Sequence, residues 1–292
     1  MRLQVVVNPA AGGGRCLRAL PAVRAALSSQ DVVVTPTRSL GHADELVDQA
    51  LADGRVVVAM GGDGIVGRVA GAVAGRGLMG VLPGGRGNDF CRAVGIPLDP
   101  VAACAVLLDA IEVRVDLGRV DGAAFLGIAS VGFDSDVQER VLSSRLPLGR
   151  LVYLVEALAT VASWRPATFT CTVDGSTDIV TGWSLAVANT GVYGAGMRLA
   201  PAASVTDNLL DVVSIAAISR TAFLRALPRV FRGSHVDLPA VRLRTARRVE
   251  LSADRPFRVF ADGDPIGRLP CAIEVDPGAV RVLLPRPRGP RR

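Results

Sequence analysis

The sequence predicts an α/β region with a parallel, doubly wound sheet, followed by an antiparallel β-sandwich. Three observations support this prediction. Four apolar stretches in the first part of the chain each lead into a loop, and apolar residues at helical spacing alternate with them. After about Asp116 this rhythm gives way to short strand-like stretches with Asp-Gly turns. Half of the 292 residues are hydrophobic, so a sizeable core is available.

The first region contains four strand-and-loop units in a row. Strands are expected at residues 2–7, 32–34, 55–60 and 78–82, with helices at 17–27, at 42–52 and after Gly64. Strands that alternate with helices form parallel sheets with both faces covered. Ligands bind beyond the carboxyl ends of such strands, so we expect the glycine-rich loops at these ends to converge on one crevice. These loops are Asn8–Arg15, Gly61–Gly67 and Pro83–Phe90.

The loop Gly61-Gly62-Asp63-Gly64 has the composition of a phosphate-binding site. Glycines let the backbone approach an anion, and the N–H groups that open the next helix add the positive end of its dipole. Asp63 repels a phosphate unless a metal ion or a transferable proton lies between them, which indicates Mg-nucleotide chemistry. The alternative is a tight turn in which Asp63 caps the helix. Residues 62–67 also fit the dinucleotide-binding pattern G-x-G-x-x-G. This match is weak, because the pattern belongs after the first strand and here follows the third, and because the acidic residue expected about twenty positions later is missing.

The second region has shorter elements. Asp121-Gly122 and Asp174-Gly175 are tight-turn signals, and residues 137–163 have a helical pattern with a break at Pro147. Further strands are expected at residues 183–189, 211–215, 241–243, 247–251, 257–260 and 279–284. The predicted domains are residues 1–115 and 116–278, with a last strand near 279–285 that completes the first domain and a mobile basic tail at 286–292.

Composition excludes several catalytic mechanisms. All 33 basic residues are arginine, so no lysine is available for a Walker A loop, a Schiff base or a general base. With only His42 and His235, carboxylates must carry any proton transfer. The net charge of +6 fits anionic ligands or an anionic membrane surface, and we expect no nucleic-acid partner. Five scattered cysteines indicate reduced, buried thiols, and the cytoplasm is the expected compartment.

Four loop motifs resemble, in order, those of the bacterial soluble lipid kinases of the diacylglycerol kinase family, relatives of the sphingosine kinases and NAD kinases. They are Asn8-Pro9-Ala10-Ala11-Gly12, Thr37 with Gly41-His42-Ala43, Gly61-Gly62-Asp63-Gly64-Ile65 and Gly85-Arg86-Gly87-Asn88-Asp89-Phe90. Asp116 and the turn Asp262-Gly263-Asp264-Pro265 match two further family features. The resemblance covers nearly the whole chain and implies an NAD kinase-like α/β domain followed by a β-sandwich.

The resemblance implies an ATP- and Mg²⁺-dependent kinase that phosphorylates a hydroxyl of diacylglycerol or a related lipid. It implies that Asp262 is the catalytic base, with Asp264 beside it and Asp63 in the same catalytic group. From the sequence alone, a hairpin turn is preferred over a catalytic base as the interpretation of Asp262-Gly263. With the resemblance, the catalytic base becomes the preferred interpretation. The implied ATP contacts are Asn8, Pro9, Ala10, Ala11, Gly12, Thr37, Gly61, Gly62, Asp63, Gly64, Ile65, Val66, Gly67, Arg86, Asn88 and Asp89.

The resemblance implies metal binding at two places. Asp63, Asp89 and Asp116 are candidates to organise the catalytic Mg²⁺. A second, structural Mg²⁺ is implied in the segment 201–211, where Asp207 and the carbonyl oxygens of Ser204 and Leu209 supply the oxygen ligands that this cation prefers. An Asx turn between strands is an equal alternative for the second segment.

Five positions depart from the family pattern. Ile65 replaces a hydroxyl residue, Gly67-Arg68 replaces Asn-Glu, Arg86 replaces threonine, and Asp264 is shorter than the usual glutamate. Arg68 and Arg86 are either additional phosphate clamps or solvated and paired side chains. Two alternatives therefore stand beside the lipid kinase: an NAD kinase-like enzyme and a catalytically degenerate module that binds nucleotide or lipid. We favour an active kinase because Asp63 and the other glycines are retained.

The stretch from Leu146 to Trp164 is apolar but too short and too interrupted to span a bilayer. It is either an interfacial helix near the mouth of the cleft, with Tyr153 and Trp164 at the interface, or an ordinary core helix. In the first case Arg145, Arg150 and the tail 286–292 draw the protein to anionic lipid at the inner face of the membrane. The expected partners are thus a lipid substrate and a membrane surface, and a homodimer is also considered.

Overall fold

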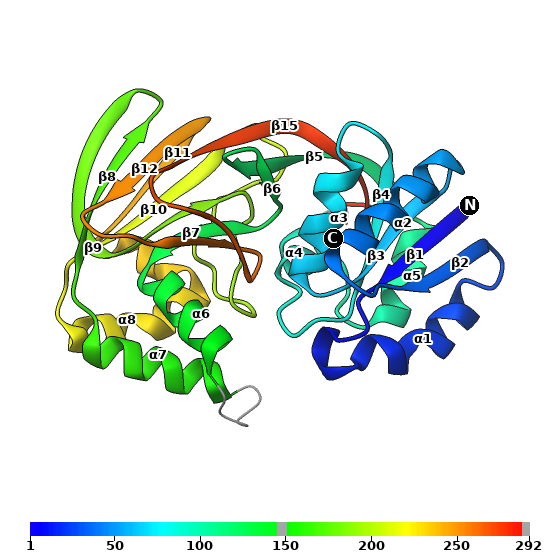
Figure 1. Ribbon diagram of the computed structural model, residues 1–292, viewed down its shortest axis with the longest axis horizontal. Helices are drawn as coiled ribbons and strands as arrows, with labels where there is room; N and C mark the ends of the chain where they lie inside the picture. Colours follow the sequence, from blue (N-terminus) through cyan, green and yellow to red (C-terminus); the bar gives the residue numbers. More distant parts are fainter. Residues whose placement is uncertain (145–150, 288–292) are drawn as a thin grey trace, which may run out of the picture.

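The computed structural model describes residues 1–144 and 151–287. Its first half is an α/β region in which five strands lie in the order β15-β4-β3-β1-β2, all parallel to their neighbours (Figure 1). The elements of this half are β1 (Arg2–Val7), η1 (Ala11–Gly13), α1 (Arg15–Ala26), β2 (Asp31–Pro36), α2 (Leu40–Ala52), β3 (Val56–Gly61), α3 (Asp63–Val73), β4 (Leu78–Pro83), α4 (Asp89–Val94), α5 (Pro100–Leu108) and β5 (Ile111–Val120).

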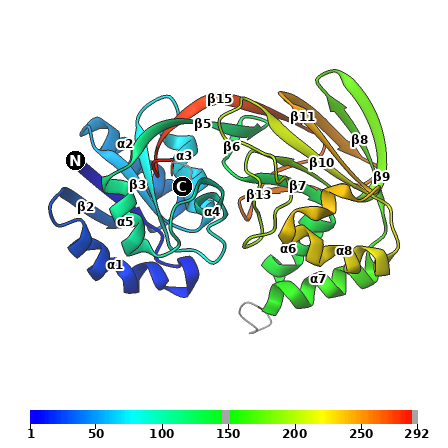
Figure 2. The ribbon, with the colours of Figure 1, turned by 180° about the vertical axis from the view of Figure 1, so that it is seen from behind.

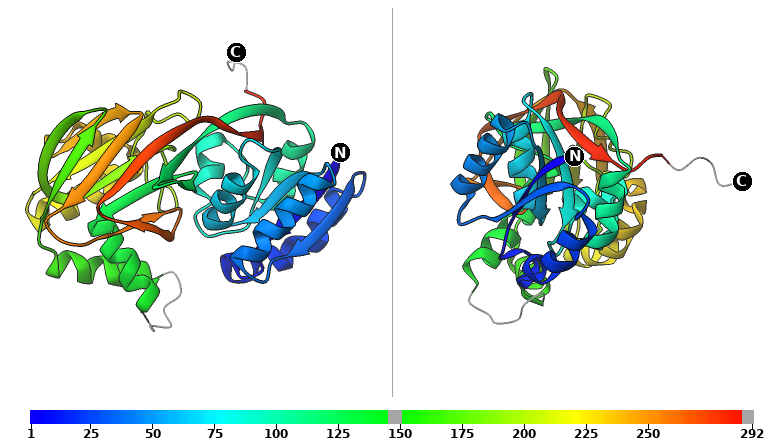
Figure 3. Two further views of the ribbon diagram at one scale, coloured as in Figure 1. Left: turned by 45° about the horizontal axis from the view of Figure 1, so that its top comes forward. Right: turned by 90° about the vertical axis from the view of Figure 1, so that its right-hand side faces the viewer.

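Helices cover both faces of this parallel sheet. α1 packs with α5 on one face, and α2 packs with α3 on the other, so the central strands are fully buried (Figure 3). The chain leaves β1 toward β2 but leaves β3 toward β4, so the strand order reverses between β1 and β3. In a doubly wound sheet this reversal opens a crevice at the carboxyl ends of the two strands. The predicted fold of this region is confirmed.

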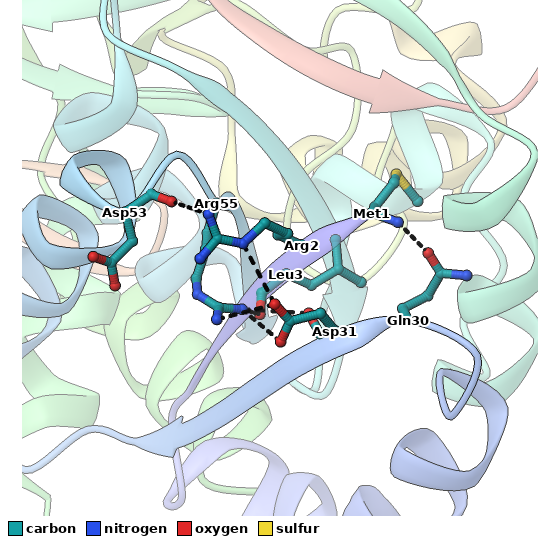
Figure 4. Close-up of polar contacts among 7 residues, drawn as sticks. All are labelled: Met1, Arg2, Leu3, Gln30, Asp31, Asp53 and Arg55. Atoms are coloured by element: carbon teal, nitrogen blue, oxygen red, sulfur yellow. Dashed lines mark hydrogen bonds and ion pairs between the residues drawn. The ribbon is translucent and has the colours of Figure 1, made fainter.

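The amino ends of these strands are closed by a network of ion pairs. Asp31 on β2 accepts hydrogen bonds from Arg55 Nη1 (3.1 Å to Oδ1) and Nη2 (3.2 Å to Oδ2), and Arg2 Nε lies 3.4 Å from its Oδ2 (Figure 4). These hydrogen bonds lower the pKa of Asp31 below its ordinary value. Arg2 also donates to the carbonyl oxygen of Asp53 (2.7 Å). This edge of the sheet is structural, and the crevice lies at the opposite edge.

The two halves of the molecule share one sheet. β15 (Cys271–Leu284) pairs in parallel with β4 near its end, in antiparallel fashion with β12 near its start, and with β5 along most of its length. Figures 1 and 3 show β15 and β5 running side by side from one half to the other. The last strand of the chain therefore belongs to both halves.

The second half is an antiparallel sheet in the order β14-β13-β7-β9-β8-β12-β15, with β10 beside β9 and β11 beside β10. Three helices lie together on one side of it (Figure 2). The elements are β6 (Ala123–Phe125), β7 (Ile128–Gly132), α6 (Phe133–Ser143), α7 (Leu151–Ser163), β8 (Ala167–Val173), β9 (Ser176–Ala188), β10 (Leu210–Ala216), α8 (Arg220–Arg232), η2 (Ser234–Asp237), β11 (Val241–Ala246), β12 (Arg248–Ala253), β13 (Arg258–Ala261) and β14 (Asp264–Arg268).

Several elements of this half differ from the sequence expectation, and β7 and β14 were not among the expected strands. The strand expected at residues 183–189 is only the buried end of the longer strand β9, and the helix α8 was not expected at all. The expected helical segment is present as α6 and α7, and the expected break at Pro147 lies outside the described residues. All five cysteines are buried and free, as predicted.

The expectation that Trp164 reaches an interface is wrong. Trp164 is only 4% exposed and packs edge-on against Phe133, with ring centroids 5.8 Å apart, in an aromatic cluster that includes Trp183. Tyr153 on α7 is 48% exposed, so it remains at the surface. Arg145, Arg150 and most of the expected tail 286–292 lie outside the described residues. None of the helices in the described residues combines the length and the apolar character needed to cross a membrane.

Candidate active site

The three glycine-rich loops of the α/β region pack against one another at the carboxyl ends of β1, β3 and β4. A Cβ atom at Gly12 would lie 2.4 Å from the carbonyl oxygen of Gly84, and one at Gly85 would lie 2.3 Å from the Cα of Gly62. Gly12 also has a φ of +59°, a conformation that favours glycine. The predicted convergence of these loops is therefore confirmed, and only glycine backbones can approach so closely.

The residues expected to contact ATP lie along these loops. Asn8 follows β1, and its Oδ1 accepts the N–H of Ala10 at 3.0 Å. Thr37 follows β2, and its N–H donates to the carbonyl oxygen of Val7 at 2.8 Å. Both thus lie at the carboxyl edge of the sheet. Contact with ATP stays a prediction for Asn8, Pro9, Ala10, Ala11, Gly12, Thr37, Gly61, Gly62, Gly64, Ile65, Val66 and Gly67.

The departures from the family pattern have different structural roles. Ile65 is buried, and a Cβ at Gly61 would lie 2.3 Å from its Cγ2, so this side chain packs onto the loop backbone. Arg68 forms an ion pair with Asp44 on α2, with 2.9 Å between Nε and Oδ1. Arg86 is exposed and lines the cavity described below. Of the two arginines, Arg86 is therefore the one positioned to meet an anionic ligand.

Asp63 and Asp89 lie close together where α3 and α4 begin. Asp63 Oδ1 accepts the N–H of Phe90 at 3.2 Å, and Asp89 Oδ2 accepts the N–H of Ala195 at 3.0 Å. A Cβ at Gly87 would lie 3.0 Å from an oxygen of each carboxylate. Burial and the charge of Asp63 raise the pKa of Asp89 to about 6. Burial also raises the pKa of Asp63.

Asn88 shapes the loop that carries Asp89. It has a φ of +52°, and its side chain is bound to Gly85 on both sides: Oδ1 accepts the N–H at 2.8 Å and Nδ2 donates to the carbonyl oxygen at 3.1 Å. Asparagine tolerates the left-handed conformation better than most residues. The side chain of Asn88 therefore holds the loop from within.

Asp262 is fixed by a tight turn and by a neighbouring loop. It begins the two-residue turn between β13 and β14, with a φ of +55°. Its Oδ1 accepts the N–H of Gly127 and its Oδ2 accepts that of Leu126, each at 2.8 Å. A carboxylate oxygen has two lone pairs, so each oxygen can still accept one more hydrogen bond.

Glycines on α3 make room for the carboxylates of this turn. A Cβ at Gly67 would lie 2.5 Å from Asp262 Oδ2, and one at Gly64 would lie 2.5 Å from Asp264 Oδ2. The turn of the second half therefore packs directly onto the helix that follows the phosphate-binding loop. The two halves build this site jointly.

The protonation of Asp262 differs from that of an ordinary carboxyl. Asp262 is partly buried and lines the cavity described below. Burial, together with the charges of Asp63 and Asp264, raises its pKa to about 7, against the opposing hydrogen bonds from Leu126 and Gly127. Burial also raises the pKa of Asp264, which is exposed at the surface of the turn. A carboxyl with a pKa near neutrality is well suited to general base catalysis.

A largely apolar cavity of about 720 Å³ begins at these carboxylates. Asp63, Asp89 and Asp262 line one part of it. The remaining wall includes β7, the three helices of the second half and the loop after β9, with Phe133, Val161, Phe223 and Leu227 among its apolar side chains. A charged end and an apolar body are the features of a binding site for an amphipathic molecule.

The donor set at Asp63 and Asp89 fits a magnesium ion. Asp89 Oδ1 is buried without a hydrogen-bond partner, and Arg92 Nε is 3.9 Å away from it. Within residues 1–144 and 151–287, no group of three or more acidic, histidine or cysteine side chains could hold a metal ion. Magnesium is usually bound by one or two carboxylates, and substrate phosphates complete its coordination. Two carboxylates beside a phosphate-binding loop meet that requirement.

The carboxylate of Asp116 is bound by two other segments, and its part in organising the catalytic Mg²⁺ stays a prediction. Asp116 is buried on β5, where Oδ1 accepts the N–H of Gly278 (2.6 Å) and Oδ2 accepts that of Asn208 (2.8 Å). It therefore lies against the loop that contains Ser204, Asp207 and Leu209. Within that loop Asp207 Oδ1 accepts the N–H of Leu209 at 3.1 Å, the Asx turn considered above. A structural metal at this loop stays a prediction.

Sequence reasoning missed the residues of the second half that complete the site. Leu126 and Gly127 hold Asp262 through backbone N–H groups, and Ala195 holds Asp89 in the same way. Backbone contacts leave no side-chain signal in a sequence. Tyr193 and Asp134, which also line the cavity, were missed because nothing near them in the sequence marks a site.

The chain matches two protein families over almost its whole length. Residues 2–120 match the diacylglycerol kinase catalytic domain, and residues 127–284 match the YegS C-terminal NAD kinase beta sandwich-like domain. The crystal structure of a diacylglycerol kinase from Bacillus anthracis superimposes with a TM-score of 0.77 at 21% identity and covers 98% of this chain and 97% of that one. The comparison with this crystal structure supports the fold.

Curated relatives agree with these matches. A diacylglycerol kinase of Mycobacterium tuberculosis strain H37Rv is 35% identical over 296 residues, which cover 98% of this chain and 96% of the relative. The "Probable lipid kinase YegS-like" of Pseudomonas aeruginosa PAO1 is 36% identical over 273 residues, 90% of this chain and 89% of the relative. Together with the carboxylates and glycine loops at the cavity, these matches show that the chain belongs to the diacylglycerol kinase family of bacterial lipid kinases.

Proposed function

We propose that the protein uses ATP and Mg²⁺ to phosphorylate a hydroxyl of diacylglycerol or a related lipid. The observation that carries this proposal is the cavity, which joins three carboxylates and a glycine-rich loop to an apolar space of about 720 Å³. Phosphoryl transfer needs a phosphate cradle and a base, and a lipid acceptor needs an apolar space for its chains. The cavity brings these requirements into one place.

Asp262 is the base in this proposal. The acceptor oxygen attacks the γ-phosphorus of ATP, the proton of the hydroxyl passes to Asp262, and the bond from the γ-phosphorus to the bridging oxygen breaks to release ADP. The backbone N–H groups of Leu126 and Gly127 hold the carboxylate in place. Asp262 therefore needs no reorientation during transfer.

Asp63 and Asp89 would hold the magnesium ion, which neutralises phosphate charge when it is bound. Without this ion the two carboxylates would repel the phosphates of ATP. The exposed guanidinium of Arg86 supplies a further positive group at the cavity. The glycine loops offer backbone N–H groups where a lysine serves in other nucleotide-binding folds.

Transfer of labelled phosphate from ATP to a panel of lipids tests the proposal. We expect labelled product with diacylglycerol or a related lipid alcohol in mixed micelles with Mg²⁺, and none with glycerol or NAD. Formation of NADP would favour the NAD kinase alternative. Tight binding of ATP with no transfer to any acceptor would favour a degenerate binding module and would contradict the proposal.

The cavity also suggests how the protein reaches its acceptor. Four of its lining side chains lie on α7 and α8 and are at the same time exposed: Tyr153 (48%), Leu158 (50%), Leu224 (38%) and Phe231 (55%). Leu224 and Phe231 are seven residues apart on α8. The exposed Arg225 follows Leu224, and the exposed Arg232 follows Phe231. Residues at this spacing lie on one face of a helix. An apolar rim with adjacent arginines is suited to an anionic bilayer.

We therefore extend the proposal to peripheral contact between α7, α8 and the inner face of the membrane. Binding to phosphatidylglycerol vesicles should weaken by about 30-fold at low salt in the double variant Arg225→Gln with Arg232→Gln, at about 1 kcal/mol for each arginine. Arg24→Gln with Arg247→Gln removes the same charge from exposed positions elsewhere and should have little effect. Equal losses in the two variants would contradict this docking surface. A homodimer stays a prediction, to be checked by light scattering.

A further inference from the structure

A carboxylic acid with no part in phosphoryl transfer stands in the wall of the cavity. Asp134 is the second residue of α6 and lines the cavity together with Val137 and Val161. The register of β7 and β9 places Ser184 opposite Gly132, two residues before Asp134. The hydroxyl groups of Tyr193 and Ser184 lie close enough to the Asp134 carboxylate to lower its pKa. Asp134 is thus a carboxylate with two hydroxyl neighbours in the wall of the cavity.

The charge of Asp134 has little compensation from the protein. Burial raises its pKa to about 6, and the hydrogen bonds from Tyr193 and Ser184 oppose that rise. The pKa of Tyr193 is raised well above its ordinary value by burial and by Asp134, so its hydroxyl keeps its proton and donates. Among the described residues that line the cavity, Arg86 is the one arginine. A carboxylate has about four acceptor positions, so two donors leave it able to accept more.

Asp134 is linked to the transfer site through one short loop. Tyr193 and Met197 exchange backbone hydrogen bonds of 2.9 and 2.8 Å, which closes a tight loop between them. Ala195 in this loop donates its N–H to Asp89 at 3.0 Å. The residues that hold Asp134 and Asp89 are therefore only two positions apart. A lipid headgroup that presents a hydroxyl to Asp262 enters the same cavity that Asp134 lines.

We propose that Asp134, in the wall of the cavity that Asp262 also lines, selects the acceptor lipid by binding a hydrogen-bond donor on its headgroup other than the hydroxyl that is phosphorylated. The inference rests on the lipid kinase function proposed above. An ionised carboxylate only accepts hydrogen bonds, so the complementary group is a second hydroxyl or an ammonium group. A diacylglycerol carries one hydroxyl, and its ester oxygens are acceptors. Asp134 therefore favours a monoacylglycerol or a long-chain amino alcohol over a diacylglycerol.

Acceptor competition tests this inference. Monoacylglycerol, diacylglycerol of the same chain and a long-chain amino alcohol are compared in identical mixed micelles. In Asp134→Leu, kcat/KM should fall by about 10- to 100-fold for the two acceptors with a second donor, and much less for diacylglycerol. In Asp134→Asn the amide oxygen still accepts from a hydroxyl, so monoacylglycerol should be retained better than the amino alcohol. The KM for ATP should not change.

Asp136→Asn is the matched control. Asp136 lies on the same helix two residues later and is not among the described residues that line the cavity. Equal losses for all acceptors in Asp134→Leu, or a wild-type enzyme without preference for a second donor, would overturn the inference. If the wild type phosphorylates no lipid, the proposed function fails instead. Displacement of a fluorescent acyl probe by the same three lipids then tests selection at Asp134 without turnover, and equal displacement by all three would overturn it.

Discussion

Asp174 and Asp262 each begin a two-residue Asp-Gly turn between antiparallel strands. Their φ angles are +46° and +55°, and those of the following glycines are +87° and +92°. In both turns the carboxylate also binds a neighbouring segment. Asp174 accepts the N–H of Arg248 at 2.9 Å, and Asp262 accepts that of Gly127 at 2.8 Å. The local structures are nearly the same.

Their surroundings differ. Asp174 is exposed at the end of the β8–β9 hairpin, whereas Asp262 faces a cavity and lies near the charges of Asp63 and Asp264. The comparison shows that the turn fixes the position of a carboxylate and that tertiary packing decides its chemistry. The two interpretations of Asp262-Gly263, hairpin turn and catalytic base, are therefore compatible.

The same substitution in both turns gives the largest expected difference. Asp262→Asn removes the proton acceptor, so kcat should fall by about 10²- to 10⁴-fold while the KM for ATP changes little. Asp174→Asn should leave both constants near the wild-type values. Steady-state kinetics with lipid and ATP varied in turn checks this, and a wild-type rate in Asp262→Asn would refute the base assignment.

A methyl group placed against Asp262 should lower the rate by displacing the carboxylate, without changing its chemical nature. In Gly67→Ala the new Cβ would lie 2.5 Å from Asp262 Oδ2, so the carboxylate must move. A misplacement of this kind costs about 10²-fold in rate. Gly71→Ala, one turn further along α3, meets the Cβ of Ala124 at 2.9 Å and should disturb packing without moving Asp262. Similar kinetics in the two variants would argue against a role for the close fit at Gly67.

Asp63→Asn should separate nucleotide binding from proton transfer. We expect the KM for ATP and the Mg²⁺ concentration for half-maximal rate to rise by about 10-fold or more, because one of two carboxylates that would hold the ion is lost. Asp48→Asn removes an exposed carboxylate that pairs with Arg76 and serves as the control. Unchanged Mg²⁺ dependence in Asp63→Asn would remove Asp63 from the metal site.

The smallest effect is expected at the amino edge of the parallel sheet. Hydrogen bonds from Arg55 lower the pKa of Asp31 below 3.8, so its charge stabilises the fold above that pH and the contribution is lost as the pH falls through the lowered pKa. Asp31→Asn should therefore lower Tm slightly at pH 7, with a difference that disappears in acid, and should leave kinetics unchanged. A Tm difference that grows as the pH falls would contradict this.

The α/β region could be predicted because each of its strands leads directly into a glycine loop or a helix pattern. α8 was missed although Phe223, Leu227 and Val230 recur at helical spacing between Ser219 and Gly233, because Pro228 lies within this pattern. The exposed first part of β9 lacks the apolar run that marked its buried end. Local signals thus identify elements with a continuous apolar pattern and miss stretches where that pattern is interrupted or absent.

The same limit of local sequence signals applies to the residues of the site. Asp63 and the glycine loops have strong local signals, whereas Asp134 and Tyr193 come together only when α6 and the loop after β9 meet across the cavity. Asp116 matched a family feature, but its neighbours are the loop at Asn208 and Gly278. Proximity between distant segments, which decides the role of a carboxylate, is a property of the tertiary fold.

The pH dependence of the reaction tests the central claim most directly. With ATP and lipid both held well below their KM values and Mg²⁺ in excess, the rate constant reports the groups of the free enzyme. Burial raises the pKa of Asp262 to about 7, so the base is protonated and inactive below that pH. We predict an acid limb with an apparent pKa of about 7 that is absent from the residual activity of Asp262→Asn and unchanged in Asp174→Asn. An acid limb near pH 4, or one that persists in Asp262→Asn, would contradict the account.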